Sequence, residues 1–204
     1  MRKTRQLTLW IVLTVFVILL FSSVTPAQSS NGVPVFKVTP EDSSIRFSVK
    51  ASVSIDGTFD KWDATLTFPS TDPTSGVLDV KIQAASVDTG SGFKNDKLKS
   101  SDFFNADHDP YITFKSTKVV QTGPNTFELD GNFTIRGVTR AEKLVLTASG
   151  EGMGSGAIVG TMAFDRKDYG MNSGIPFIRI ADRVEVSVDL KVKRVSGPPL
   201  AFKK

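Results

Sequence analysis

The sequence predicts an all-β protein, an eight-stranded antiparallel barrel with a short helical lid segment. About eight segments alternate apolar with polar residues, which is typical of strands with one dry and one wet face. Short turns join most of these segments, without the spacing that helix-linked parallel strands need. The first and last segments are both long, and pairing them would leave no exposed sheet edge. This favours a closed barrel over the alternative of a β-sandwich.

The first half of the chain predicts three strands. The first covers residues 44–55, after which Gly57 permits a bend and Phe59 resumes the apolar face. The second covers residues 62–68 and ends at a turn rich in Pro, Ser, Thr and Asp. The third covers residues 78–84 and again has one apolar face.

Residues 93–114 are the one stretch that does not have the pattern of strand and turn. Between Asp96 and Phe104, apolar residues stand among charges, and two serines mark a break, so we expect one or two short helical turns. The pair Phe103 and Phe104 must be buried. Packing over the open end of a β-structure would bury it and would make this segment a lid. The alternative is a short connecting helix that plugs the core.

The second half of the chain predicts five more strands. A glycine-rich turn falls between the third and the fourth of them, and a pair of prolines after the last one ends the fold. The five strands are expected at residues 111–120, 127–136, 144–148, 158–164 and 184–192.

Aromatic rings dominate the apolar faces, while the charged residues fall on the opposite faces. An eight-stranded barrel either fills with side chains or holds one small ligand. If a cavity exists, its occupant is therefore apolar and elongated; the alternative is a barrel packed solid by these rings. The candidate ligand-binding residues of the interior and lid are Phe47, Phe59, Phe68, Ile82, Leu98, Phe103, Phe104, Phe114, Phe127, Phe133 and Phe164.

The N-terminus has the pattern of a secretory signal peptide. Three basic residues within the first five positions precede an uncharged run, and Thr25 and Ala27 suit the recognition positions of a signal peptidase. We expect cleavage after Ala27 and a periplasmic or secreted protein. The apolar run of roughly 18 residues also reaches the lower limit of a membrane span, so an uncleaved membrane anchor is the alternative.

This pattern sets the expected division of the chain and its charge. The segments are a signal peptide (1–27), a loose lead-in (28–39), the barrel domain (40–195) and a short C-terminal tail (196–204). Three of the 25 basic residues lie in the signal peptide, so the rest of the chain nearly balances its 21 acidic residues. The remaining charges alternate in sign and form no basic patch, which argues against a nucleic-acid partner.

The composition offers little for catalysis. The absence of Cys excludes a disulfide, a thiolate metal site and a cysteine nucleophile. His108 is the only histidine, and the Gly-Ser-Gly sequences at 90–92 and 154–156 have the wrong spacing for a nucleophile elbow. Asp102, Asp107 and Asp109 lack the ligand periodicity of a calcium loop and are typical of a turn. We expect no catalytic residue, no metal site and no cofactor, so the protein is predicted not to be an enzyme.

Several short motifs, in order and spacing, resemble the YceI-like family, a bacterial lipocalin-like family associated with binding polyisoprenoids. The resemblance covers residues 38–195. The motifs are SIRF at 44–47, GTF at 57–59, SVDT at 86–89, PYITFKS at 110–116, GNFTIRGVT at 131–139, RKDYGM at 166–171 and ADRV at 181–184.

The resemblance implies an extended, lipocalin-like eight-stranded barrel that holds a long isoprenoid or fatty-acyl-like chain, in an exported and usually periplasmic protein without catalytic activity. The family often has Arg and His beside the Asp and Leu of the lid, where this chain has Asn95 and Lys97. Lys97 can still meet an anionic phosphate as a point charge, although the lysines of this segment also suit a solvated helix face. Arg166 is expected at the barrel mouth, where it fixes either a loop or the polar end of a ligand. The candidate head-group contacts are Lys97, Arg166 and Asp96.

The sequence therefore predicts an exported protein that sequesters or carries one amphipathic lipid, such as a quinone or a prenyl phosphate. The alternatives are a membrane-anchored interaction module with a filled barrel, and a hydrolase or isomerase that uses His108 or Asp96 on the bound lipid. Whether two barrels associate as a homodimer stays open at this point.

Overall fold

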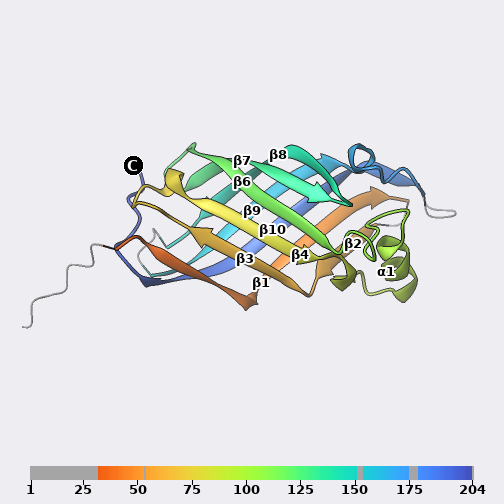
Figure 1. Cartoon of the computed structure of the whole chain (residues 1–204), viewed down its shortest axis with the longest axis horizontal. Coiled ribbons are helices and arrows are strands. Elements are labelled where there is room, and N and C mark those ends of the chain that lie inside the picture. Colours follow the sequence, from red (N-terminus) through yellow and green to blue (C-terminus); the bar gives the residue numbers. More distant parts are fainter. Residues whose placement is uncertain (1–31, 53, 151–153, 175–178, 204) are drawn as a thin grey trace, which may run out of the picture. The chain divides into compact units, whose positions relative to one another are not determined.

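The structure is a computed structural model that describes residues 32–52, 54–150, 154–174 and 179–203. The expected signal peptide or anchor, the start of the lead-in and the middle of the glycine-rich turn lie outside the described residues. Within the described residues, ten strand segments form one antiparallel sheet that closes on itself (Figure 1). They are β1 (Val35–Ala51), β2 (Ile55–Phe59), β3 (Trp62–Thr67), β4 (Val77–Gln83), β5 (Val87–Asp88), β6 (Tyr111–Gln121), β7 (Thr126–Ile135), β8 (Val138–Ala148), β9 (Ser155–Asp165) and β10 (Ile180–Ser196). The helical elements are α1 (Gly92–Lys99) and the 3-10 turns η1 (Pro73–Ser75), η2 (Ala84–Ser86) and η3 (Arg166–Tyr169).

The ten segments make eight barrel strands, because two of the strands are each interrupted once. Only Asp60 and Lys61 separate β2 from β3, and both segments pair with β1. The turn η2 separates β4 from β5, which pair with β3 and β2. The prediction of an eight-stranded antiparallel barrel with one short helix is confirmed.

Pairing between the first and the last strand closes the barrel. β1 and β10 run antiparallel, from Val35 opposite Ser196 to Ala51 opposite Ile180. On its other side β1 pairs with β2 and β3. The edges that an open sheet would leave unpaired are thus hydrogen-bonded to each other.

β1 starts within the segment 28–39 that the sequence suggests as a loose lead-in. From Val35 onward this segment is barrel wall, and the Phe36 ring packs edge-to-face on Phe68 with 5.5 Å between ring centroids. Pro40 does not end the strand, because it lies in an irregular stretch where the register between β1 and β10 shifts. The barrel domain therefore begins earlier than the predicted residue 40.

Buried side chains divide the barrel interior into two apolar cavities. α1 lies at one end of the barrel and the C-terminus at the other (Figure 1). Along β7, Phe133 lines the cavity beneath α1, and Phe127 lines the cavity near the C-terminus. We call these the helix-end cavity and the tail-end cavity.

A constriction, here called the waist, separates the two cavities. It consists of residues that lie between the two sets of lining residues along β6, β7, β9 and β10: Phe114, Gly131, Gly160, Val188 and Leu190. The Phe114 ring occupies the space that a side chain at Gly131 would fill, and a Cβ at Gly131 would lie 2.5 Å from it. Glycine on one strand thus makes room for the aromatic ring of its neighbour.

We expect Gly131→Ala to destabilise the barrel by about 1–3 kcal/mol, because the new methyl group overlaps the Phe114 ring and the Lys115 carbonyl oxygen. Urea unfolding measures the change. Gly92→Ala is the matched control, since nothing lies within 4 Å of its Cβ position, and it should be neutral or slightly stabilising. Equal effects of the two substitutions would contradict the packing described for the waist.

Candidate functional site

The lid consists of α1 and the turn that follows it. α1 covers Gly92–Lys99, so it starts and ends earlier than the expected stretch from Asp96 to Phe104. Ser100 ends the helix, and the Phe104 amide then donates to the carbonyl oxygen of Leu98 at 2.9 Å. This compact turn brings Leu98, Phe103 and Phe104, all buried, over the end of the barrel.

Two aromatic clusters form the walls beneath the lid. Phe104 of the lid packs on Phe47 and Phe59, with ring centroids 6.4 and 5.9 Å away, and these two rings are 5.6 Å apart. On the opposite strands, Phe133 and Phe164 are 5.1 Å apart, and both contact Tyr169. Aromatic rings at such distances add attraction to the area that they bury, so the lid is held by the barrel wall itself.

The helix-end cavity has a volume of ≈ 70 Å³. Arg166 is the charged residue among its lining side chains, and the other walls are apolar. Most of the predicted interior and lid residues line it: Phe47, Phe59, Ile82, Leu98, Phe103, Phe104, Phe133 and Phe164. The structure therefore brings these residues together around one space.

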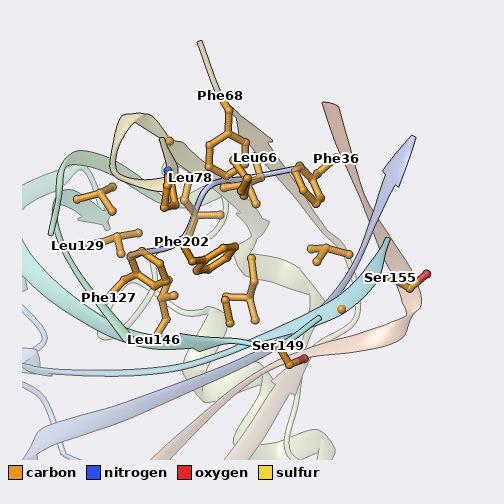
Figure 2. Close-up of a pocket in the computed structure, with 18 of the residues that line it drawn as sticks. Phe36, Leu66, Phe68, Leu78, Phe127, Leu129, Leu146, Ser149, Ser155 and Phe202 are labelled. Carbon is orange, nitrogen blue, oxygen red and sulfur yellow. The ribbon is translucent and has the colours of Figure 1, made fainter. Parts of the chain in front are cut away.

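The other three predicted residues lie elsewhere in the barrel. Phe114 forms the waist, whereas Phe68 and Phe127 line the tail-end cavity, which also has a volume of ≈ 70 Å³ (Figure 2). A further ring in this cavity, Phe202, comes from the C-terminal tail, where the sequence analysis places no functional residue. An aromatic residue in an otherwise polar or proline-rich tail is the signal that could have identified it.

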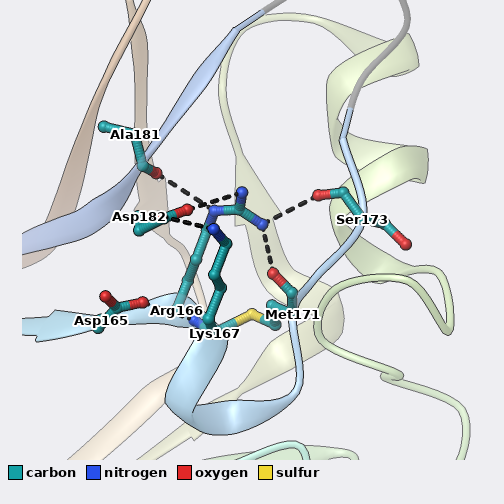
Figure 3. A network of polar contacts seen from close by, with 7 residues as sticks. All are labelled: Asp165, Arg166, Lys167, Met171, Ser173, Ala181 and Asp182. Carbon is teal, nitrogen blue, oxygen red and sulfur yellow. Dashed lines mark hydrogen bonds and ion pairs between the residues drawn. The ribbon is translucent and has the colours of Figure 1, made fainter.

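Arg166 holds a loop and a strand end at the mouth of the helix-end cavity (Figure 3). Its guanidinium donates to the carbonyl oxygens of Met171, Ser173 and Ala181, with the last two at 2.9 and 3.2 Å. It also pairs with Asp182, 3.1 Å away, and Lys167 pairs with the other oxygen of this carboxylate at 2.7 Å. The hydrogen bond from Lys167, and to a smaller extent the charge of Arg166, holds the pKa of Asp182 below its usual range. These contacts support the structural role of Arg166; a head-group contact stays a prediction.

Lys97 and Asp102 form a polar latch on the lid. The Lys97 ammonium pairs with Asp102, and the Ser173 hydroxyl donates to the same carboxylate at 3.1 Å. The latch therefore ties the lid to the loop that Arg166 holds. The hydrogen bond from Lys97, and then that from Ser173, holds the pKa of Asp102 below its usual range. A phosphate would have to compete with Asp102 for Lys97, while Asp96 is exposed to solvent.

Tyr169 and Met171 are buried residues of the motif at 166–171 that the sequence analysis does not assign to the site. The Tyr169 hydroxyl donates to Glu142 at 2.8 Å, and burial, followed by this hydrogen bond, raises the pKa of Tyr169. Tyr169 thus stays a neutral donor and links η3 to β8. Spacing alone does not reveal this role, because the partner carboxylate lies 27 positions earlier in the chain.

The residues considered for catalysis do not gather at the cavity. His108 is exposed in the turn after the lid, and Asp109 accepts a hydrogen bond from the Asn105 amide at 2.9 Å. Among the described residues, no group of three or more His, Cys, Asp or Glu side chains could hold a metal ion. In the same part of the chain, no helix has both the length and the apolar character to span a membrane.

A closed antiparallel barrel with an apolar interior and a helical lid places the protein among small barrels of lipocalin-like architecture. The model of the YceI-like domain matches residues 36–192, and the chain belongs to the YceI-like family. The resemblance found in the sequence is confirmed.

Curated relatives of the chain are UPF0312 proteins. That of Azotobacter vinelandii is 34% identical over 96 residues, which cover 47% of this chain and 50% of the relative. That of Shewanella sp. (strain MR-4) is 31% identical over 120 residues, which cover 56% of this chain and 63% of the relative. The chain thus spans between half and two thirds of the length of these relatives.

Solved structures share the fold. BcnA of Burkholderia cenocepacia has a TM-score of 0.69 at 24% identity, over 76% of this chain and 99% of that one. A polyisoprenoid binding domain from Saccharophagus degradans, implicated in plant cell wall breakdown, has a TM-score of 0.63 at 15% identity, over 79% of this chain and 99% of that one. The YceI protein of Campylobacter jejuni has a TM-score of 0.57 at 24% identity, over 74% and 85%.

We expect Arg166→Met to lower the free energy of unfolding by about 3 kcal/mol, because it leaves three carbonyl oxygens and Asp182 without their buried partner. Chemical denaturation measures the loss. Arg183→Met is the control, since its pair with Glu185 is exposed, and its effect should stay within about 0.5 kcal/mol. A similarly small effect at Arg166 would contradict its role in holding the loop.

We expect Asp102→Asn to loosen the lid at neutral pH, seen as faster hydrogen exchange of the α1 amides. Because the pKa of Asp102 is lowered in the folded protein, the stability it contributes is present above its ordinary value of 3.8 and is lost as the pH falls through the lower folded-state value. The difference from the natural protein should therefore shrink below about pH 4. Asp96→Asn is the control, because Asp96 is exposed on the same helix. It should leave the hydrogen exchange of the α1 amides unchanged both at neutral pH and at low pH.

Proposed function

We propose that the protein is an exported lipid-binding barrel that holds the apolar chain of one amphipathic lipid, of the isoprenoid or fatty-acyl type, without transforming it. The observation that carries this proposal is the helix-end cavity, an apolar space closed by the three buried side chains of a lid. Membership of the YceI-like family and the printed description of the Saccharophagus degradans domain as polyisoprenoid binding support it.

Burial of the chain supplies the affinity. Each Å² of apolar surface removed from water contributes about 25 cal/mol before ordering costs, and apart from Arg166 the residues that line the cavity are aromatic or aliphatic. The cavity volume of ≈ 70 Å³ is less than a long prenyl chain needs, because ligand pockets usually have several hundred Å³. Binding therefore includes an outward movement of Phe103 and Phe104 with the lid, which the latch at Asp102 opposes.

The polar end of the lipid stays at the barrel mouth. Arg166 and Lys97 already have protein partners, so a head group gains little by replacing them. We infer that specificity comes from the length and shape of the chain more than from its head group. Export to the periplasm rests on the signal-peptide pattern of the N-terminus.

The small volume of both cavities favours one competing function, an interaction module with a filled barrel. The two functions differ in a direct measurement, native mass spectrometry of the full chain purified from the exported fraction, followed by solvent extraction. A stoichiometric long-chain lipid supports the carrier. A bare protein mass that farnesol or a longer prenol does not shift would support the filled barrel and overturn the carrier.

A variant that fills the cavity gives an independent test. Val184 is buried in the helix-end cavity, and we expect Val184→Phe to weaken lipid binding at least about tenfold by occupying the space of the chain. Val195→Phe is the matched control on the same strand, because Val195 is 55% exposed. Thermal unfolding verifies that both variants are folded. Equal binding by a folded Val184→Phe protein would exclude this cavity as the binding site.

A further inference from the structure

The end of the barrel opposite the lid is covered by the C-terminal residues 197–203, which we call the strap. β10 ends at Ser196, and Gly197 has a positive φ of 77°. A Cβ at Gly197 would lie 2.1 Å from the Val33 carbonyl oxygen, so only glycine allows this turn. Two prolines follow, and they cannot continue the pairing with β1. The chain therefore leaves the sheet here and crosses the barrel end.

The strap is attached on two sides of the opening. The Ala201 amide donates to the Thr71 carbonyl oxygen, 2.8 Å away in the loop after β3. The Gln121 side chain, at the end of β6, accepts from the Lys203 amide at 3.2 Å and donates to the Lys203 carbonyl oxygen at 3.0 Å. The strap thus connects the loop after β3 with the end of β6, on two different parts of the barrel rim.

Between these attachments the strap inserts a ring into the barrel. Phe202 points into the tail-end cavity among Phe127, Leu146 and Leu78 (Figure 2). Its ring meets that of Phe127 edge-to-face, with 5.8 Å between centroids. The Phe202 ring therefore occupies space that the apolar group of a ligand could fill. The lining of this cavity includes no charged residue.

The strap is held more weakly than the walls around it. A barrel strand such as β10 has eleven paired positions with β9 alone, whereas the strap has one inserted ring and hydrogen bonds at Gly197, Ala201 and Lys203. Segments with few hydrogen bonds and few buried groups open locally without unfolding the rest. The waist separates this end from the helix-end cavity, so opening the strap exposes the tail-end cavity alone.

We propose that the tail-end cavity is a second apolar binding site, gated by the strap, which takes an uncharged prenyl or alkyl chain when Phe202 moves out. The closed strap competes with the chain, so the apparent affinity is reduced by the fraction of molecules in which the strap is open. The proposal extends the lipid-binding function proposed above from one apolar site to two, with separate gates.

The test uses farnesol as an uncharged isoprenoid probe and the full chain carrying Val184→Phe, so that the helix-end cavity is blocked. Adding Phe202→Asp should tighten farnesol binding at least about tenfold, because a carboxylate does not enter the apolar cavity and the strap stays open. Val195→Asp is the matched control: it adds the same charge at an exposed position of β10 next to the strap and should leave the affinity unchanged. Isothermal titration measures the affinity, and hydrogen exchange should show loss of protection at the Ala201 and Lys203 amides when farnesol binds.

Each other outcome decides against the proposal. If Phe202→Asp and Val195→Asp bind farnesol equally, the strap is not a gate. If the natural chain binds farnesol but every variant with Val184→Phe fails to bind it, the helix-end site stands and the tail-end site does not exist. If no protein binds farnesol, including the natural chain, both proposals fail. The Phe202→Asp protein should keep the thermal unfolding transition of the natural chain. This shows that the barrel is folded, so that these outcomes concern the strap.

Discussion

The pairing of β1 with β10 is the constraint on which the rest of the structure depends. Once the first and last strands are hydrogen-bonded along their length, the sheet has a defined interior that must hold the apolar face of every strand. Large rings from several strands then point at one another across a narrow space. Closure of the sheet encloses the apolar faces of the alternating strands, and the candidate binding sites lie at the two ends of the barrel.

The interior is neither packed solid nor one continuous pore. Phe114 fills the waist because Gly131 on the neighbouring strand leaves room for its ring, and a cavity lies on each side of it. Both of the hypotheses that the sequence allows, a filled barrel and a cavity, thus describe part of the molecule. The position of the Phe114 ring relative to Gly131 determines which part of the barrel is filled and which parts are hollow. This position depends on the register between β6 and β7 more than on composition.

The sequence predicts the elements that have a local pattern, but it does not reveal residues whose roles depend on partners far away in the chain. Alternation identifies the strands and the Phe-rich interior, and the run from Leu98 to Phe104 identifies the lid. The start of β1 is missed because the alternation is clear only from Ser44, whereas β1 extends back to Val35 across the shift in register that accommodates Pro40. The same reasoning misses Phe202 and Tyr169, since their roles depend on Phe127 and Glu142, far away in the chain.

The two ends of the barrel are closed by different chemistry, and this difference bears on function. At the lid, aromatic packing is reinforced by charged groups: Asp102 accepts from Lys97 and Ser173, and Arg166 fixes the loop that carries Ser173. At the strap, the ring of Phe202 and hydrogen bonds to backbone groups of Gly197, Ala201 and Lys203 provide the closure, and no ion pair between side chains is described there. Ion pairs respond to pH, salt and anionic head groups, whereas the opening that we propose for the strap depends on competition by an apolar group for the position of Phe202. A barrel with two such ends can hold a chain at one end independently of what occupies the other, because the waist keeps the two spaces apart.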